Sequence, residues 1–154
     1  MKLNLSLVFA AFFGGLAALP VAAQSQGEAQ DDMAPKDVVE LNLNDFLWEK
    51  RPIVVFADTD RDPAFIRQLE LLEARSAALD ARDVVILTDT DPDALSPLRK
   101  KLRPRGFMLV LIGKDGGVKL RKPFPWSVRE LSRAIDKMPM RQQEIRDQAA
   151  EADG

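Results

Sequence analysis

Residues 107–121 read FMLVLIGKDGGVKLR, and this stretch decides the fold of the chain. The apolar run from Phe107 to Ile112 predicts a buried strand. The turn GKDGG at residues 113–117 follows it and is rich in residues that tolerate positive φ. We therefore expect Val118 to Arg121 to pair antiparallel with the preceding strand. A hairpin stands here in place of a further parallel strand.

Two apolar runs upstream of the hairpin predict parallel strands, each followed by a helix. Ile53 to Ala57 and Val84 to Thr88 are continuous apolar runs, which are typical of strands buried on both faces. Asp62 is an N-cap residue, and proline at the first helical position favours a helix over Pro63–Ala81. Ser96-Pro97 repeats this start for a shorter helix.

Two helices show an apolar face in their spacing. The predicted first helix carries its apolar stripe at Phe65, Leu69, Leu72 and Leu79. A capping box, Ser127 to Glu130, begins the last helix, which should end before Pro139. Its apolar positions are Val128, Leu131, Ile135 and Met138.

The order β-α-β-α-β-β-α predicts an α/β fold with a four-stranded mixed sheet. The expected sheet order is second, first, third, fourth strand, with the first central and the fourth antiparallel. Val38 to Leu43 indicates an additional N-terminal edge strand, and Asn44 or Asp45 can cap a short helical turn carrying Phe46 and Trp48. This arrangement looks like the minimal thioredoxin fold. A flavodoxin-like sheet, the alternative, would need another parallel strand.

Two stretches resemble one known family. Residues 111–121 (LIGKDGGVKLR) and 135–141 (IDKMPMR) are similar to an uncharacterised thioredoxin-like family, the domain of unknown function 4174. This family occurs in exported bacterial proteins and as a domain of extracellular sushi-repeat and matrix proteins of animals. The resemblance covers about residues 40–146. It implies a thioredoxin-like fold and an exported protein, and it implies no established enzymatic activity.

The N-terminus has the pattern of a secretory signal. An uncharged apolar segment from Leu3 to Leu19 precedes a small-residue site, and we expect cleavage after Ala23. A retained membrane anchor is the alternative, because such a segment is at the lower limit for a membrane span. The predicted organisation is a signal at 1–23, a disordered spacer at 24–37, a thioredoxin-like domain at 38–146 and a flexible tail at 147–154.

The composition excludes several chemistries. The chain contains no cysteine, histidine or tyrosine. Thiol redox chemistry, thiolate nucleophiles and imidazole catalysis are therefore excluded, as are thiolate and imidazole metal ligands. Residues 24–154 contain 21 basic and 24 acidic residues. This balance argues against nucleic acid as a partner.

Two stretches are nearly alike. Residues 54–62 (VVFADTDRD) and 85–93 (VILTDTDPD) each end an apolar strand in an acidic loop, which we expect at the same edge of the sheet. Three readings stay open. The acids cap helices and end strands; or they bind Ca or Mg; or they serve a cation-dependent hydrolase. The candidate metal ligands are Asp58, Asp60, Asp62, Asp89, Asp91 and Asp93.

The first loop bears on both functional readings. Asp58 and Asp60 resemble the D-x-D strand end of haloacid-dehalogenase-type phosphatases, but the chain lacks room for a cap module. In thioredoxins this position carries C-x-x-C, and here carboxylates replace the thiols. The proline that thioredoxins place before the third strand is also missing. These departures argue against oxidoreductase activity.

A basic run and an aromatic loop are candidate partner contacts. The run is predicted to lie on the outside of the short helix and just after it: Arg99, Lys100, Lys101, Arg103 and Arg105. Its structural reading is a solvated helix end. Trp126 is expected to pack against the sheet, and if exposed it becomes a binding anchor.

The sequence therefore predicts an exported, periplasmic or secreted, non-redox thioredoxin-like domain that acts as a binding module. The expected partner is a protein or an envelope component. No nucleic acid, no membrane span after signal cleavage and no cofactor other than Ca or Mg is expected. The sequence favours a non-enzymatic role, with the cation-dependent hydrolase as the alternative.

Overall fold

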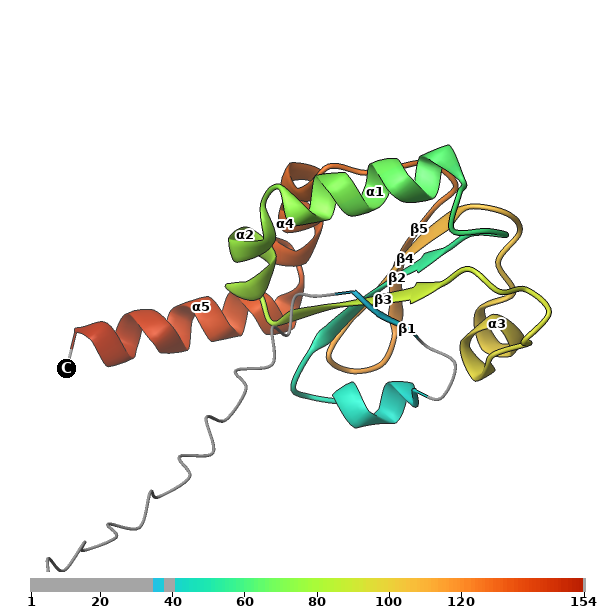
Figure 1. The fold of residues 1–154 in the computed structure, drawn as a ribbon. Coiled ribbons are helices and arrows are strands. Elements are labelled where there is room, and N and C mark those ends of the chain that lie inside the picture. The colour runs from blue at the N-terminus through green and yellow to red at the C-terminus, as the bar shows by residue number, and fades with distance from the viewer. Residues whose placement is uncertain (1–34, 38–40, 154) are drawn as a thin grey trace, which may run out of the picture.

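Five strands form one mixed sheet with helices on both faces (Figure 1). The computed structural model describes residues 35–37 and 41–153. The predicted signal peptide and residues 24–34 of the predicted spacer lie outside the described residues. The elements are β1 (Lys36–Asp37), the 3-10 helix η1 (Leu43–Phe46), β2 (Arg51–Phe56), α1 (Pro63–Glu73), α2 (Ser76–Asp80), β3 (Val84–Asp89), α3 (Pro97–Leu102), β4 (Met108–Ile112), β5 (Val118–Lys122), α4 (Val128–Asp136) and α5 (Pro139–Ala152).

The sheet order is β1-β3-β2-β4-β5. The predicted order of the four main strands and the central place of the first are confirmed. β2 pairs parallel with β3, from Arg51 opposite Val84 to Phe56 opposite Asp89. β4 runs antiparallel to β2, and β5 runs antiparallel to β4 as the Gly-rich turn predicts. β2 and β3 therefore finish at the same end of the sheet, and the β4–β5 turn lies at the other end, where β2 and β3 begin.

An N-terminal edge strand is present, and it begins before the predicted span. β1 comprises Lys36 and Asp37 and pairs parallel with β3. Of the predicted span 38–43, residues 38–40 lie outside the described residues, and no strand is found at 41–43. Asn42 ends any strand there because its side chain accepts from the Asn44 backbone N–H at 3.0 Å and caps η1. Asn44 and Asp45, the predicted caps, therefore lie inside η1.

Alternate residues of the central strand face two separate cores. Ile53, Val55 and Ala57 face α1, α2 and α4, whereas Val54 and Phe56 face α3 and η1. Every residue of β2 is buried. Because both faces are covered, the strand is apolar from Pro52 to Phe56 instead of alternating. The same layering places α1, α2 and α4 on one side of the sheet in Figure 1 and α3 on the other.

The predicted helix starts are confirmed. Asp62 accepts from the backbone N–H groups of Ala64 and Phe65, and Ser96 accepts from that of Arg99. Ser127 and Glu130 form both bonds of the capping box. The hydrogen bonds from the Ser127 backbone and hydroxyl lower the pKa of Glu130. The capping residues alone therefore predict where these three helices begin.

Two helix ends differ from the sequence expectation. The predicted helix at 63–81 is broken into α1 and α2 at Arg75, which has φ −140° and no side-chain cap. Its apolar stripe still packs into one core.

The chain is helical from Pro139 to Ala152, although the sequence predicted a flexible tail from residue 147. Proline begins α5 instead of ending the chain's last helix. Within the described residues, no helix combines the length and apolarity that crossing a membrane requires.

Candidate functional site

The acidic loops lie at the predicted edge of the sheet, but their six carboxylates do not converge. Asp58, Asp60, Asp91 and Asp93 are exposed, Asp62 is half-buried, and Asp89 is buried. No three acidic side chains among the described residues gather closely enough to hold a metal ion. The described residues therefore give the hydrolase alternative no support, and a cation site at these six aspartates stays a prediction.

Local hydrogen bonds explain why these carboxylates stay apart. The Asp62 carboxylate accepts hydrogen bonds from backbone N–H groups at the N-terminus of α1. Asp91 accepts from the backbone N–H groups of Asp93 and Ala94 and so closes its own turn. Asp89 turns inward. Each of these three acids therefore has partners close in sequence, as the capping reading predicts.

The inward-turned Asp89 forms a buried network with α3. Its Oδ1 accepts from Arg99 Nε at 2.7 Å, and its Oδ2 accepts from Ser96 Oγ at 2.5 Å. Arg99 Nη2 also donates to the carbonyl oxygens of Ala57 and Asp89. Its guanidinium lies 5.5 Å from the centroid of the Phe56 ring. This network ties α3 to the ends of β2 and β3.

The basic run is thus divided. Arg99, predicted to face outward for partner binding, is 8% exposed. The prediction fails because the side chain finds Asp89 and two carbonyl oxygens beneath the helix, which satisfy its charge and donors. The remaining members are exposed: Lys100, Lys101, Arg103 and Arg105. Trp126 packs against the core as expected, with Lys122 Nζ 4.3 Å from its ring centroid.

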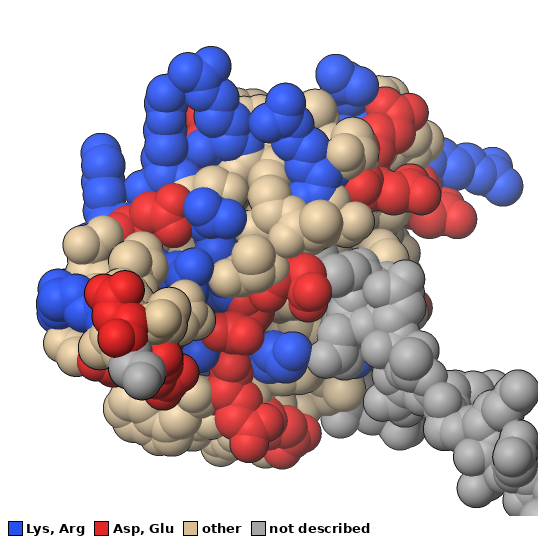
Figure 2. Space-filling model, turned by 90° about the vertical axis from the view of Figure 1, so that its left-hand side faces the viewer, with Lys and Arg blue, Asp and Glu red and all other residues tan. Residues whose placement is uncertain are grey.

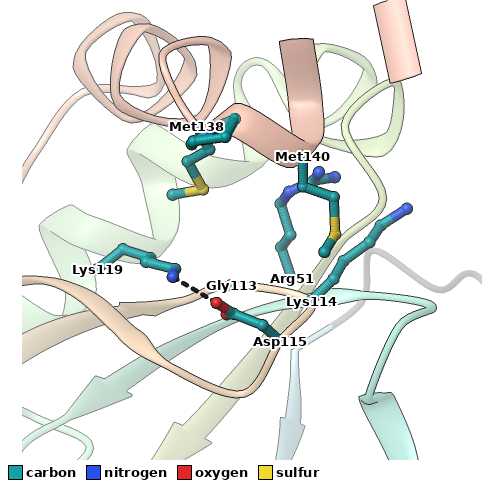
Figure 3. Close-up of a pocket in the computed structure, with 8 residues that line it drawn as sticks. Arg51, Gly113, Lys114, Asp115, Lys119, Met138 and Met140 are labelled. Carbon is teal, nitrogen blue, oxygen red and sulfur yellow. Dashed lines mark hydrogen bonds and ion pairs between the residues drawn. The ribbon is translucent and has the colours of Figure 1, made fainter. Parts of the chain in front are cut away.

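A groove lies at the opposite end of the sheet, between the β4–β5 turn and the junction of α4 with α5. We call it the hairpin groove. Its volume is about 240 Å³, and its lining residues are Arg51, Gly113, Lys114, Asp115, Lys119, Met138, Pro139 and Met140. Figure 3 shows the two methionines on the helix side of the groove and the Lys119–Asp115 pair on the hairpin side. Apolar groups therefore face a charged rim.

The glycine at position 113 keeps the hairpin side of the groove in shape. A side chain there would begin 2.5 Å from Lys119 Cε and from Asp115 Oδ1. Lys119 Nζ lies 2.7 Å from Asp115 Oδ2, and the bond from Lys119 with that from the Gly117 N–H lowers the pKa of Asp115. The ion pair can lie flat across the turn because residue 113 has no side chain.

Loop 47–50 packs against the β4–β5 turn. Trp48 donates its backbone N–H to the Lys114 carbonyl at 2.7 Å, and its own backbone is left-handed at φ 67°. Leu47 packs so closely that a side chain at Gly116, which has φ 75°, would begin 2.8 Å from Leu47 Cδ2. Trp48 as a whole residue is 66% exposed. The left-handed backbone of Trp48 thus allows its hydrogen bond to the hairpin, while its side chain lies mostly in solvent.

A charge network forms the back of the hairpin groove. Glu144 accepts from three cations: Arg51 at 2.8 Å, Lys114 at 3.0 Å and Arg141 at 3.1 Å. Partial burial would raise the pKa of Glu144, but the hydrogen bonds from these three cations lower it to about 2. Arg51 is only 1% exposed and also donates to the Arg82 carbonyl. A single carboxylate therefore joins β2, the hairpin and α5.

Further ion pairs surround this centre. Asp83 pairs with Lys114 at 2.8 Å, and Asp136 pairs with Arg82 at 2.8 Å. Arg141 Nε lies 3.8 Å from Asp136 and has no hydrogen-bond partner. Figure 2, seen from the side of α2 and α5, shows acidic side chains in a band among basic ones. The face is mixed in charge and has no large patch of one sign.

Sequence reasoning missed the hairpin groove, although its residues were in view. Gly113 to Lys119 lies in one of the two family-like stretches, and Met138 to Met140 lies in the other. The structure brings both stretches together at one groove. Two motifs far apart in the sequence but meeting in space are the signal that could have located it.

The sheet order and the helix placement define a thioredoxin-like fold. Among solved structures, a reduced 2-Cys peroxiredoxin of Plasmodium vivax is similar with a TM-score of 0.53 at 16% identity, covering 67% of this chain and 85% of that one. Chloroplastic thioredoxin z matches with a TM-score of 0.51 at 21% identity, covering 66% and 91%. Desulfothioredoxin from Desulfovibrio vulgaris Hildenborough matches at 0.50 and 24%, covering 68% and 96%. These likenesses show the fold alone.

Residues 42–144 match the family described as Domain of unknown function (DUF4174), and the chain belongs to this family. A curated relative, Coiled-coil domain-containing protein 80 of Danio rerio, is 29% identical over 133 residues. The match covers 67% of this chain and 15% of that relative. The chain thus corresponds to a small part of that protein's length.

Proposed function

We propose that this protein is an exported, non-redox thioredoxin-like domain that binds a protein or envelope component through the hairpin groove. The observation that carries the proposal is the groove itself, where the two family-like stretches meet. Concave sites with apolar walls and a few placed polar groups are the usual form of binding sites. The hairpin groove has this form.

The end of the sheet where β2 and β3 finish is held by structural contacts among the described residues. A thioredoxin uses that end for its dithiol, and this chain contains no cysteine. The Asp89–Arg99 pair occupies the space beneath the loops, where both side chains are less than a tenth exposed. We therefore place the binding function at the hairpin end.

Export is proposed from the sequence. Residues 1–23 carry the features of a secretory signal, and the absence of cysteine leaves the domain indifferent to an oxidising compartment. The periplasm is the proposed compartment. Expression of the full chain in a Gram-negative host, followed by fractionation and mass measurement, tests this; a product kept in the cytoplasm with residues 1–23 intact would contradict it.

Site-specific crosslinking tests the binding role. We would place a photo-crosslinking amino acid at Pro139, which is exposed and lines the groove, and at Arg129 on α4 as a control. In the native host, the Pro139 position should give a discrete adduct and the Arg129 position should not. Met140→Arg, which narrows the groove, should remove the adduct while the circular dichroism spectrum stays unchanged. An adduct that forms equally at both positions, or at neither, would exclude this site.

A further inference from the structure

The hairpin groove continues into a second hollow along the edge strand β5. This hollow has a volume of about 270 Å³ and shares Lys119, Met138 and Pro139 with the first. It adds Leu120 and Lys137 to the lining, among others. We call the two adjoining hollows together the trough.

The charges at the rim of this trough are unevenly satisfied. Among the carboxylates, Asp83 is within ion-pair distance of two cations, and Glu144 of three. Lys137, in contrast, is exposed, and no ion pair joins it to any carboxylate in the described part of the chain. Lys119 has one partner, Asp115, and this pair is solvent-accessible, with side chains 35% and 41% exposed. Exposed pairs of this kind contribute little and exchange partners readily.

The lysines are therefore the groups left to meet a ligand. Lys119 on β5 and Lys137 after α4 both line the second hollow. Met138 and Pro139 line the same hollow and supply apolar surface. Methionine side chains adapt to differently shaped apolar groups. A ligand that complements this surface has an apolar group flanked by negative charges.

The edge strand favours an extended ligand. β5 is the last strand in the sheet order and pairs with β4 on one side. Val118 is exposed, and Arg121 is exposed as well. Basic residues on an edge strand discourage pairing between copies of the same chain. The same charges attract an acidic strand, and strand addition at a free edge is a common mode of peptide recognition.

We propose that the trough binds an extended acidic segment of a polypeptide that carries a leucine- or methionine-sized side chain between its carboxylates. The apolar side chain contacts Met138 and Met140, and the carboxylates pair with Lys119 and Lys137. This inference rests on the proposed function of the hairpin groove and specifies its partner. The positive charge that these two lysines offer is a local feature, because the chain as a whole has a formal net charge of −2.

Fluorescence anisotropy with synthetic peptides tests the inference. The probe is fluorescein-labelled Asp-Glu-Leu-Asp-Met-Glu, compared with Lys-Arg-Leu-Lys-Met-Arg and with Asp-Glu-Ser-Asp-Ser-Glu. We expect saturable binding of the first peptide alone, with affinity falling as salt is raised. Lys119→Glu and Lys137→Glu should each raise its Kd about tenfold, because each replaces an attraction by a repulsion. Arg129→Glu, the same charge change outside the trough, should leave Kd within about twofold.

The outcomes separate this inference from the proposed function. Equal binding of the basic peptide, or a Kd unaffected by both lysine variants, would refute the acidic segment. Binding to phosphatidylglycerol vesicles but not to the peptide would also refute the acidic segment, and would indicate a membrane surface as the partner. If Lys119→Glu alters the circular dichroism melt, Lys137→Gln gives the same test without charge reversal. An adduct at Pro139 without peptide binding leaves the proposed function intact and this inference wrong; absence of both refutes both.

Discussion

Arg99 and Asp89 form a buried ion pair, with 2.7 Å between Nε and Oδ1, at the end of the sheet where thioredoxins carry their dithiol. The pair receives support from Ser96 and from two backbone carbonyls. Because both partners are nearly inaccessible to solvent, neither can lose the other without leaving an uncompensated charge. Residues that look like a metal site and a basic patch in the sequence instead hold α3 against the sheet.

The first prediction concerns this pair. Arg99→Ala should lower the free energy of unfolding by about 3–5 kcal/mol, because it leaves Asp89 charged and buried. Urea denaturation followed by circular dichroism measures the change. Lys100→Ala, one position along the same helix but exposed, should change stability by no more than about 0.5 kcal/mol. A loss below about 1 kcal/mol for Arg99→Ala would show that Asp89 finds another partner or becomes neutral.

Two neighbouring glycines should respond differently to alanine. Gly116→Ala should lower the free energy of unfolding by about 1–2 kcal/mol, because its left-handed backbone disfavours a side chain and Leu47 lies in the way. At Gly117 the new methyl group would meet only the mobile ends of Asp115 and Lys119 at 3.3 Å. That variant should be close to neutral. Equal melting temperatures for the two variants would contradict the assigned geometry.

Trp48 should be replaceable by glycine without loss of stability. A left-handed backbone costs a residue with a side chain about 1–2 kcal/mol, whereas glycine costs about 0.5–1 kcal/mol in chain entropy. Because the indole is mostly exposed, little packing is lost. Trp48→Gly should therefore leave the unfolding free energy equal or up to about 1 kcal/mol higher, and Trp48→Val should lower it. A clear loss in Trp48→Gly would mean that the ring packs on the hairpin in solution.

The ion pairs of Glu144 should make the free energy of unfolding fall in acid. Its folded pKa of about 2 lies below the ordinary value of 4.5, so the carboxylate stabilises the fold above about pH 4.5. This contribution is lost as the pH falls toward the folded pKa of about 2. Its size is on the order of 3 kcal/mol. Urea melts at several pH values should show the loss in the native protein.

Matched variants assign that pH dependence to Glu144. Glu144→Gln should lower stability at pH 7 and flatten the decline between about pH 5 and 2. Glu151→Gln, on an exposed turn of the same helix, should leave the profile unchanged. A Glu144→Gln profile parallel to that of the native protein would place the titrating group elsewhere.

Divalent cations should have no effect on stability. The acids of the two D-T-D-x-D loops do not assemble into a group that could hold an ion. Thermal melts in chelator and then with calcium, magnesium or manganese should therefore give the same midpoint. A rise of several degrees that disappears in Asp58→Asn would show that the loops close around a cation in solution.

Much of the fold could be predicted because its signals are local. The caps at Asp62, Ser96 and Ser127 act on backbone groups within three residues, so the sequence specifies these helix starts directly. The turn at Gly113 to Gly117 fixes the antiparallel hairpin in the same way. The continuous apolar runs of β2 and β3 reflect burial on both faces.

Weaker local signals led to errors. α5 has a single buried residue, Arg141, so no apolar stripe marks it. Its attachment depends on Glu144 meeting cations from β2 and the hairpin. The break at Arg75 likewise has no proline or glycine to announce it. The attachment of α5 depends on contacts with distant elements, and nothing in the structure explains the break at Arg75.

The sequence by itself determined the order of the four main strands, the starts of α1, α3 and α4, the Gly-rich hairpin and the absence of thiol chemistry, since each follows from residue type or short-range spacing. Only the tertiary structure decided which charges are satisfied. It turned Arg99 and Asp89 inward, kept the remaining acids apart and joined two distant stretches at the hairpin groove. The physical reason is that a side chain's charge and burial depend on all its neighbours, and most neighbours at these sites come from elsewhere in the chain.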